Sequence, residues 1–198
     1  NLHDLYSEAY TPWEWHEQLF AVAKEEGLEC FSSPFDPTAV ELLEKLNVPA
    51  YKIASFEITD IPLIELVASK GKPIIISTGI AELEDIELAI DACERMGNGN
   101  IALLKCTSSY PAPIEEANMI MVKDFAERFN MIVGLSDHTI GSTAPVVATC
   151  FGARIIEKHF ILDRSIGGPD ASFSMNEAEF TEMVKAVREA EKAIGKVD

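Results

Sequence analysis

Residues 132–160 read IVGLSDHTIGSTAPVVATCFGARIIEKHF, and this stretch decides the class of fold that the sequence predicts. Short apolar runs at 132–139 and 154–160 are typical of buried strands, and the longer stretch 142–152 between them is typical of a helix. A strand, a helix and a second strand in this order form the βαβ unit of a parallel sheet. Both strands end in polar side chains, which are costly to bury and therefore mark candidate functional positions.

The same alternation of strands and helices continues over the rest of the chain. Further strands are predicted at 28–35, 51–57, 73–79 and 101–111. Further helices are predicted at 12–26, 37–46, 60–70, 82–96, 115–129 and 176–194. Gly27, Gly71 and Gly97 lie where helices should end, and Asp36 before Pro37 is typical of a helix start. Because no low-complexity linker interrupts the series, we expect a single domain over residues 1–198.

Two architectures repeat βα units, the closed eight-stranded barrel and the open doubly wound sheet. The G-x-G-x-x-G fingerprint that would favour the open sheet is absent, and polar residues end nearly every strand. In a closed barrel these ends meet at one mouth, where barrel enzymes keep their active sites, so we expect a (β/α)8 TIM barrel. Since such a barrel typically needs about 250 residues, we expect the chain to lack one or two βα units.

The charge balance restricts the partners of the protein. Sixteen basic residues face 33 acidic ones, and the net charge of -17 repels nucleic acids and anionic membranes, although a local pocket can still bind a small anion. The four cysteines lack a C-x-x-C pair, which argues against a zinc knuckle and predicts free thiols. No apolar stretch is long enough to span a membrane, so we expect a cytoplasmic protein. The chain begins at Asn1 rather than Met, and we expect a piece of something longer.

Two histidines are the candidate metal ligands. His138 and His159 end successive strands, so in a barrel their imidazoles would lie side by side within reach of one divalent ion; each could instead be a hydrogen-bonded residue at a strand end. Glu157 shares a face with His159 and could orient that ring or pair with a lysine. His3 and His16 fall outside the strand ends, and we expect them at the surface.

The segment YKIASFE, residues 51–57, places Lys52, Ser55 and Glu57 around an apolar strand. A lysine with nearby hydroxyls would bind phosphate or carboxylate, and Glu57 could act as a general base. The alternative is a salt bridge from Lys52 to a helix carboxylate, with Glu57 as a helix cap. Strict alternation puts Lys52 on the face opposite to Ser55 and Glu57, so a shared site requires a bend.

Hydroxyls and a long loop complete the candidate site. The serines at strand ends could line an anion pocket, although each alone could be a cap or turn residue. They are Ser33, Ser77, Ser108 and Ser136. The loop within 163–180 can bring Asp170 back over the mouth, or be a solvated loop whose Ser174 or Asn176 caps the final helix.

Six segments together resemble the sialic acid synthase family, whose members condense phosphoenolpyruvate with an N-acylated sugar to make nonulosonic acids. The segments are YKIASFE (51–57), STG (77–79), LLKCTSSYPAP (103–113), GLSDHT (134–139), EKHF (157–160) and GGPDASFS (167–174). TPWEW (11–15) and IASFE (53–57) are most similar to the branch that makes pseudaminic acid from 2,4-diacetamido-2,4,6-trideoxy-altrose. Pocket shape distinguishes this sugar from the legionaminic and neuraminic precursors, which stay as alternatives.

The resemblance implies a (β/α)8 barrel followed by a small antifreeze-like domain that reaches the active site of the partner in a homodimer. It therefore implies that the chain covers the third to eighth barrel strands. It also implies that a divalent ion, usually Mn2+ with Mg2+ or Co2+ as alternatives, polarises the aldehyde oxygen of the sugar. The enol carbon C3 would attack that aldehyde, water would add at C2, and phosphate would leave by C–O cleavage.

The residue roles below are also implied by the resemblance. His138 and His159 match the metal ligands, with Glu157 as a support for His159 and Lys158 as an ion-pair partner for a surrounding helix. Glu57 and Lys52 match the catalytic residues. The contacts to phosphoenolpyruvate match Lys52, Ser55, Ser77 and Ser136, and Ser33 is similar to a family threonine or serine. Tyr110 and Asp170 match contacts to the sugar, whereas Ser108 stands where neuraminate enzymes have asparagine.

Two competing hypotheses follow from the same residues. Deoxyheptulosonate and ketodeoxyoctonate phosphate synthases are also phosphoenolpyruvate-condensing barrels, but their phosphorylated sugars require a further basic patch, and few lysines and arginines fall at the predicted mouth. The second hypothesis is a non-catalytic barrel piece that acts as a binding or assembly module.

Overall fold

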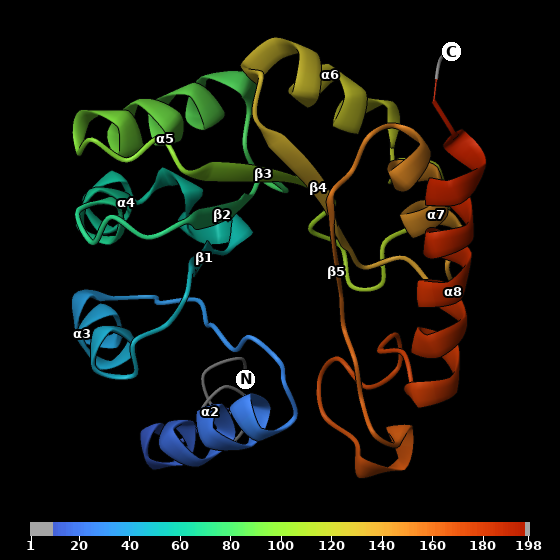
Figure 1. Cartoon of the computed structure of the whole chain (residues 1–198), viewed down its shortest axis with the longest axis horizontal. Coiled ribbons are helices and arrows are strands. Elements are labelled where there is room, and N and C mark those ends of the chain that lie inside the picture. Colours follow the sequence, from blue (N-terminus) through green and yellow to red (C-terminus); the bar gives the residue numbers. More distant parts are fainter. Residues whose placement is uncertain (1–9, 197–198) are drawn as a thin grey trace.

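The computed structural model describes residues 10–196 and consists of one parallel sheet with helices around its outside (Figure 1). The strands are β1 (Tyr51–Ile53), β2 (Ile74–Ser77), β3 (Ile101–Cys106), β4 (Ile132–Asp137) and β5 (Ile155–Lys158). The α-helices are α2 (His16–Glu25), α3 (Pro37–Lys45), α4 (Ile61–Ala68), α5 (Leu83–Arg95), α6 (Ile120–Phe129), α7 (Thr143–Cys150) and α8 (Glu177–Ile194). Short 3-10 helices are η1 (Trp13–Trp15), η2 (Ser55–Thr59), η3 (Ile114–Glu116) and η4 (Arg164–Ile166).

The order of the strands decides between the two architectures. All pairings are parallel, and the order across the sheet is β1-β2-β3-β4-β5, the same as along the chain. A doubly wound sheet reverses its winding at a switch point, whereas a barrel wall adds each new strand on the same side. The prediction of the barrel class is therefore confirmed as a parallel α/β half-barrel of five strands.

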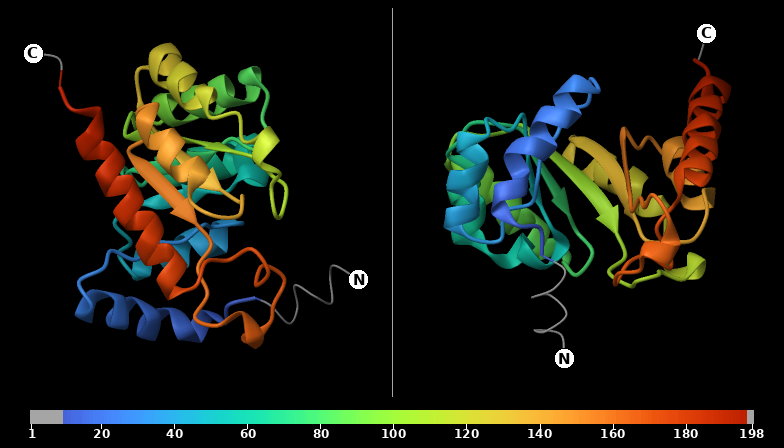
Figure 2. Two further views of the ribbon diagram at one scale, coloured as in Figure 1. Left: turned by 90° about the vertical axis from the view of Figure 1, so that its right-hand side faces the viewer. Right: turned by 90° about the horizontal axis from the view of Figure 1, so that it is seen from below.

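One ion pair shows how strongly the sheet curves. In a flat sheet, four strand spacings of about 4.8 Å would separate β1 from β5 by about 19 Å. Nevertheless, Nζ of Lys52 on β1 lies 3.7 Å from Oε2 of Glu157 on β5. Their side chains span that gap only because the sheet bends around its inner face, with the helices on the outside (Figure 2).

The prediction of a strand over 28–35 is wrong. Only Ser32 pairs with the sheet, in an isolated parallel bridge to Tyr51, and its carbonyl accepts a hydrogen bond from the backbone N–H of Lys52 at 3.3 Å. Pro34 has no N–H to donate to a ladder, and Pro37 already begins α3. The other strands form at their predicted positions but end earlier, because the chain turns into loops or 3-10 helices at their carboxyl ends.

The predicted helix starts and stops are confirmed. The carboxylate of Asp36 accepts hydrogen bonds from the backbone N–H groups of Thr38 and Ala39, at 2.7 Å and 3.0 Å, and so caps α3. Gly27, Gly71 and Gly97 all have positive φ, the left-handed conformation that commonly follows the last turn of an α-helix. Among residues 10–196, no helix has the length and apolar content needed to cross a bilayer.

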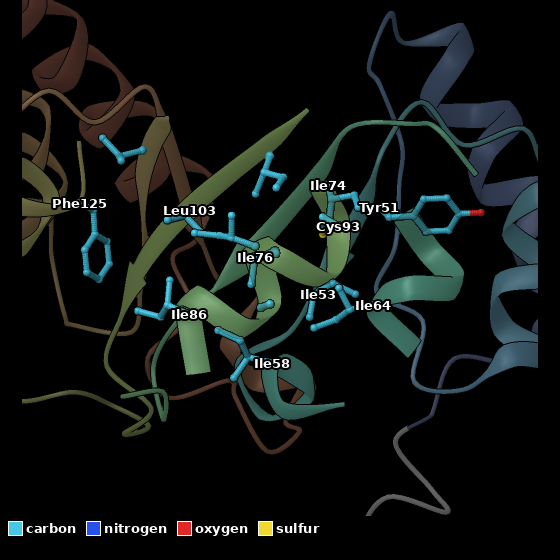
Figure 3. Close-up of a cluster of buried hydrophobic side chains, with 14 of the residues drawn as sticks. Tyr51, Ile53, Ile58, Ile64, Ile74, Ile76, Ile86, Cys93, Leu103 and Phe125 are labelled. Carbon is cyan, nitrogen blue, oxygen red and sulfur yellow. The ribbon is translucent and has the colours of Figure 1, made fainter. Parts of the chain in front are cut away.

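The hydrophobic core lies between the sheet and the helices (Figure 3). Alternate strand residues such as Ile53, Ile76 and Leu103 point into it and are fully buried. The residues between them face the inside of the half-barrel, where Lys52, Ser77 and other polar groups lie. The period of two therefore separates a structural face from a face that can carry a site.

Candidate active site

Lys52 lies on the inner face of the edge strand β1, with its ammonium close to oxygen atoms of Ile53, Ser77 and Glu157. It is 6% exposed, and its Nζ donates to Oγ of Ser77 at 2.7 Å and to the carbonyl of Ile53 at 3.1 Å. Burial lowers the pKa of Lys52, and the nearby carboxylate of Glu157 opposes that shift. This arrangement presents a desolvated ammonium and a hydroxyl to an anion at the strand ends.

Glu157 contacts the candidate anion-binding residues Ser136 and Lys52. Its Oε1 accepts a hydrogen bond from the hydroxyl of Ser136 at 2.5 Å, and its Oε2 lies 3.7 Å from Nζ of Lys52. Ser136 and Glu157 are register partners on β4 and β5, so their side chains leave the sheet on the same face. Of the two interpretations of Glu157, the lysine partner is confirmed, and the hydrogen bonds of its carboxylate do not support a role in orienting His159.

The bend that a shared site requires is present after β1. The strand ends at Ile53, and η2 begins at Ser55, so Ser55 and Glu57 leave the regular alternation. The hydroxyl oxygen of Ser55 accepts hydrogen bonds from the N–H of Ile80 at 3.0 Å and from the hydroxyl of Ser108 at 3.1 Å. The bend thus joins the ends of β1, β2 and β3 through one serine.

Gly79 leaves room for the serine hydroxyls at these strand ends. A Cβ at Gly79 would lie 2.2 Å from Oγ of Ser108 and 2.7 Å from Oγ of Ser55, so these hydroxyls would have to move to admit a side chain. The segment STG, residues 77–79, indicated a glycine at a strand end. The side chains that lie close to this glycine are determined by the fold.

Glu57 lies in η2 as a half-buried carboxyl group. Its Oε2 is buried and has no hydrogen-bond partner within residues 10–196. Burial raises the pKa of Glu57 and so favours the protonated form. A carboxyl group with an unsatisfied oxygen and a raised pKa is suited to holding or accepting a proton.

The structure brings the two predicted histidines together. The ring centroids of His138 and His159 are 5.2 Å apart. Nδ1 of His138 lies 2.9 Å from the carbonyl oxygen of Thr107, and because a carbonyl only accepts, Nδ1 must carry the proton. In the neutral form of the ring, the other nitrogen, Nε2, then has the lone pair that a metal ligand requires.

His159 has an acidic neighbour from the long loop. Its Nδ1 lies 3.5 Å from Oδ2 of Asp170. Burial lowers the pKa of His159, and Asp170 opposes that shift. A low pKa favours the neutral imidazole, the form that binds metal.

Two aromatic rings border the imidazole pair. The ring of Tyr110 lies 4.2 Å from that of His138, and the ring of Phe173 lies 4.9 Å from that of His159, measured between centroids. The predicted Tyr110 is half-exposed, whereas Phe173 is buried and was not predicted. Its position in the loop sequence gave no indication that it would turn back onto the histidines.

The remaining predicted residues are Ser33, Lys158, His16 and His3, which lie at separate places along the chain. Ser33 follows the Ser32 bridge at the β1 edge, half-buried beside the strand that carries Lys52. The expectation that Lys158 pairs with a helix is wrong, because its Nζ lies 2.5 Å from Oδ2 of Asp137 on the neighbouring strand. His16 begins α2 with Nδ1 3.2 Å from the carbonyl of Pro12, and His3 lies outside the described residues.

The cysteines are free, as predicted. Cys106 is buried on the inner face, with its sulfur 3.9 Å from Nδ1 of His138, a position that the spacing of the cysteines did not indicate. Burial raises the pKa of the Cys106 thiol, so the thiol form is favoured.

The donor set fits a divalent ion that keeps open coordination positions. Within residues 10–196, no group of three or more histidine, cysteine, aspartate or glutamate side chains is arranged to hold a metal. Two imidazoles with a fixed tautomer at one of them would leave positions for substrate and water. Such an arrangement suits catalysis better than a closed structural site.

Comparison with known proteins matches the chain to one set of relatives. The model of the NeuB family matches residues 1–198. A pseudaminic acid synthase of Helicobacter pylori is 51% identical over 195 residues, covering 98% of this chain and 57% of that protein. An N,N'-diacetyllegionaminic acid synthase of Legionella pneumophila is 39% identical, covering 92% of this chain and 52% of that protein.

Solved structures agree with this fold. An N-acetylneuraminic acid synthetase from Leptospira borgpetersenii, in complex with citrate, superimposes with a TM-score of 0.94 at 30% identity, covering 98% of this chain and 68% of that one. A phospho-2-dehydro-3-deoxyheptonate aldolase from Thermotoga maritima has a TM-score of 0.79 at 16% identity and covers 94% of this chain and 60% of that one, a likeness of fold alone. The chain spans 57% of the length of the pseudaminic acid synthase that it matches.

Proposed function

The chain belongs to the NeuB family, and from this premise we propose that the protein is a nonulosonic acid synthase. It condenses phosphoenolpyruvate with an N-acylated amino sugar and releases phosphate. The proposed sugar is 2,4-diacetamido-2,4,6-trideoxy-altrose, which gives pseudaminic acid. The choice of sugar is supported by the 51% identity to a pseudaminic acid synthase, against 39% to a legionaminic acid synthase.

The observation that carries the proposal is the buried ammonium of Lys52 among hydroxyls. An anion with a phosphate and a carboxylate would neutralise the charge of the desolvated ammonium. Its oxygens would also accept hydrogen bonds from the serine hydroxyls at the strand ends. Ser55, Ser77 and Ser136 lie around this point, and Ser33 and Ser108 lie at its edges. Before the anion binds, the carboxylate of Glu157 compensates the positive charge of Lys52.

His138 and His159 would hold the divalent ion, for which we propose Mn2+, with Mg2+ and Co2+ as alternatives. When bound, the ion supplies a Lewis acid that polarises the aldehyde of the open-chain sugar. Tyr110 and Asp170, beside the two imidazoles, would bind and orient that sugar.

The reaction then proceeds by addition at two carbons. As the C2–C3 double bond of phosphoenolpyruvate opens, C3 forms a bond with C1 of the sugar and leaves C2 electron-deficient. The aldehyde C–O double bond opens in turn, its oxygen gains a proton from solvent, and C2 takes a water molecule. Glu57 accepts the proton of that water, a role supported by its unpartnered Oε2. The C2–O bond to the phosphate breaks as the C2 carbonyl forms, so phosphate leaves with the bridging oxygen.

The finer organisation is also a proposal. We propose that residues 1–198 form part of a single TIM-barrel catalytic domain in a longer homodimeric cytoplasmic protein that also carries an antifreeze-like domain, with no nucleic acid or membrane partner. The greater length of the relatives supports this view. N-acetylneuraminate or legionaminate synthesis, and a non-catalytic binding role, are the alternatives.

Phosphate release tests the proposal. The intact protein is incubated with Mn2+, phosphoenolpyruvate labelled with 18O at the bridging oxygen, and each of the pseudaminic, legionaminic and neuraminic precursors in turn. We expect the fastest release with the altrose-configured precursor, with the label in the phosphate. Release with none of the sugars would overturn the synthase proposal, and label retained in the organic product would overturn the C–O cleavage.

A further inference from the structure

Behind His138, on the helix side of the sheet, lies a buried ion pair that the proposed reaction does not use. Lys158 and Asp137 have side chains that are each 1% exposed, and Nζ lies 2.5 Å from Oδ2. A buried charge pair of this kind is rarely needed for stability, since an apolar pair of similar size would serve as well. The contacts of the pair with the neighbouring backbone indicate another role.

The pair fixes the turn that contains His138. The ammonium of Lys158 also donates to the carbonyls of Thr139 and Gly141, the latter at 3.1 Å. Oδ1 of Asp137 accepts a hydrogen bond from the N–H of Thr139 at 2.9 Å. The three hydrogens of one ammonium thus have three oxygens from residues 137–141, which surround His138 on both sides.

The ion pair and the imidazole pair occupy successive positions on the two neighbouring chain segments. Asp137 and Lys158 are direct partners in the ladder of β4 and β5, and both point away from the inner face. The residues directly after these strands are His138 and His159, and their two rings lie 5.2 Å apart on the other side. Locking the first pair therefore fixes how the two strand ends present the second.

The ring of His138 depends on the same turn. Its backbone carbonyl accepts from the N–H of Ala112 at 2.9 Å, and its Nδ1 donates to the carbonyl of Thr107. Both partners belong to the loop after β3, so a shift of residues 137–141 would move His138 away from them. The tautomer that leaves Nε2 free is maintained only while the turn stays in place.

We infer that Lys158 is a positioning residue, which holds the 137–141 turn and thereby aims Nε2 of His138 at the site shared with His159. The relevance of this role to metal binding rests on the proposed function. The position of the His138 ring itself does not, so it can be measured without metal.

The test uses Lys158→Met in the intact protein, with Lys185→Met as the matched control because Lys185 is an exposed lysine of α8 that contacts Glu182. Without metal, imidazole NMR should show His138 protonated at Nδ1 in the wild type and in the control, and a mixture of tautomers in Lys158→Met. His138→Gln assigns the resonance. An unchanged His138 signal in Lys158→Met would overturn the inference.

Calorimetry extends the test to ligands. Lys158→Met should bind Mn2+ roughly 10- to 100-fold more weakly, as loss of a group that supports a ligand does, while phosphoenolpyruvate binding stays near wild type. Equal losses for both ligands would indicate general damage and overturn the inference. If Lys158→Met fails to fold, Asp137→Asn provides the same comparison, with a smaller tautomer shift expected. A wild type that binds no Mn2+ contradicts the proposed metal site alone.

Discussion

The two faces of the five-stranded sheet are both buried, but they carry different chemistry. On the helix side, Ile53, Ile76 and Leu103 are 0% exposed. On the inner side, Lys52 and Ser77 are almost as buried, at 6% and 2%. Apolar burial stabilises the fold, whereas a buried ammonium lowers stability unless its partners compensate. The polar groups of the inner face locate the candidate site, whereas the buried Asp137–Lys158 pair on the helix side lies at the strand ends, where it holds the 137–141 turn.

Replacing Lys52 with methionine tests the comparison where the expected effect is largest. The variant would lose charge-assisted hydrogen bonds to the substrate anion, each worth about 1.5–3 kcal/mol, so with about two such bonds kcat/KM should fall by roughly 10²- to 10⁴-fold. Phosphate release measures this loss, and urea unfolding should show a stability close to wild type. A variant with normal activity would remove Lys52 from the site.

Glu57→Gln is expected to have the next largest effect. The amide cannot accept a proton from water, so kcat should fall by roughly 10²- to 10³-fold, the scale of general base catalysis. Binding of phosphoenolpyruvate, measured by calorimetry, should stay near wild type because the role proposed for Glu57 follows binding. Weaker binding with an unchanged kcat would instead assign Glu57 to the anion pocket.

Ile76→Ala makes the reciprocal change on the helix side. Removing a fully buried isoleucine side chain should lower the free energy of unfolding by about 2–5 kcal/mol. Under conditions where the variant is folded, its kcat should be close to wild type, since Ile76 points away from the site. Urea titration and phosphate release on the same sample check both halves. A large fall in kcat at full folding would show that the two faces are not independent.

The smallest expected effect concerns pH. Burial raises the pKa of Glu57 above its ordinary value of 4.5, so above pH 4.5 the folded chain holds this proton more tightly than the unfolded chain. The contribution of Glu57 to the free energy of unfolding therefore falls as pH rises from 4.5 through the raised pKa. Glu57→Gln removes this loss, so its stability relative to wild type should increase with pH over that window. Urea titrations from about pH 4 to about pH 8 measure the difference, and a difference that shrinks with pH contradicts the shift.

Periodicity and polar strand ends were sufficient to predict the barrel class and the inner-face positions of Ser77 and Ser136. Which strands supply the partners could not be predicted. The lysine that pairs with Glu157 is Lys52, across the curved sheet, and Lys158 pairs with Asp137 through the β4–β5 register rather than with a helix. Both depend on which strands come together, which local sequence patterns do not encode. Phe173 was missed for the same reason, because a loop determines its position.

The strand 28–35 shows a different kind of failure. Its composition is typical of a strand, but Pro34 and the start of α3 leave room for only the bridge at Ser32. Here a local rule about proline, applied more strictly, would have corrected the prediction. The sequence thus already contained the two prolines, Pro34 and Pro37, that exclude a full strand here.

The sequential strand order has a consequence for recombination between relatives. Lys52, Ser55 and Ser77 come from the segments around β1 and β2, whereas Tyr110, Asp170 and the two histidines come later in the chain. A chimera with its crossover between α5 and β3 would inherit Lys52, Ser55 and Ser77 from one parent, and Ser136, Glu157 and the candidate sugar contacts from the other. Only parents that match at contacts such as Lys52–Glu157 and Ser55–Ser108, which join the halves, should give active hybrids with an exchanged sugar preference.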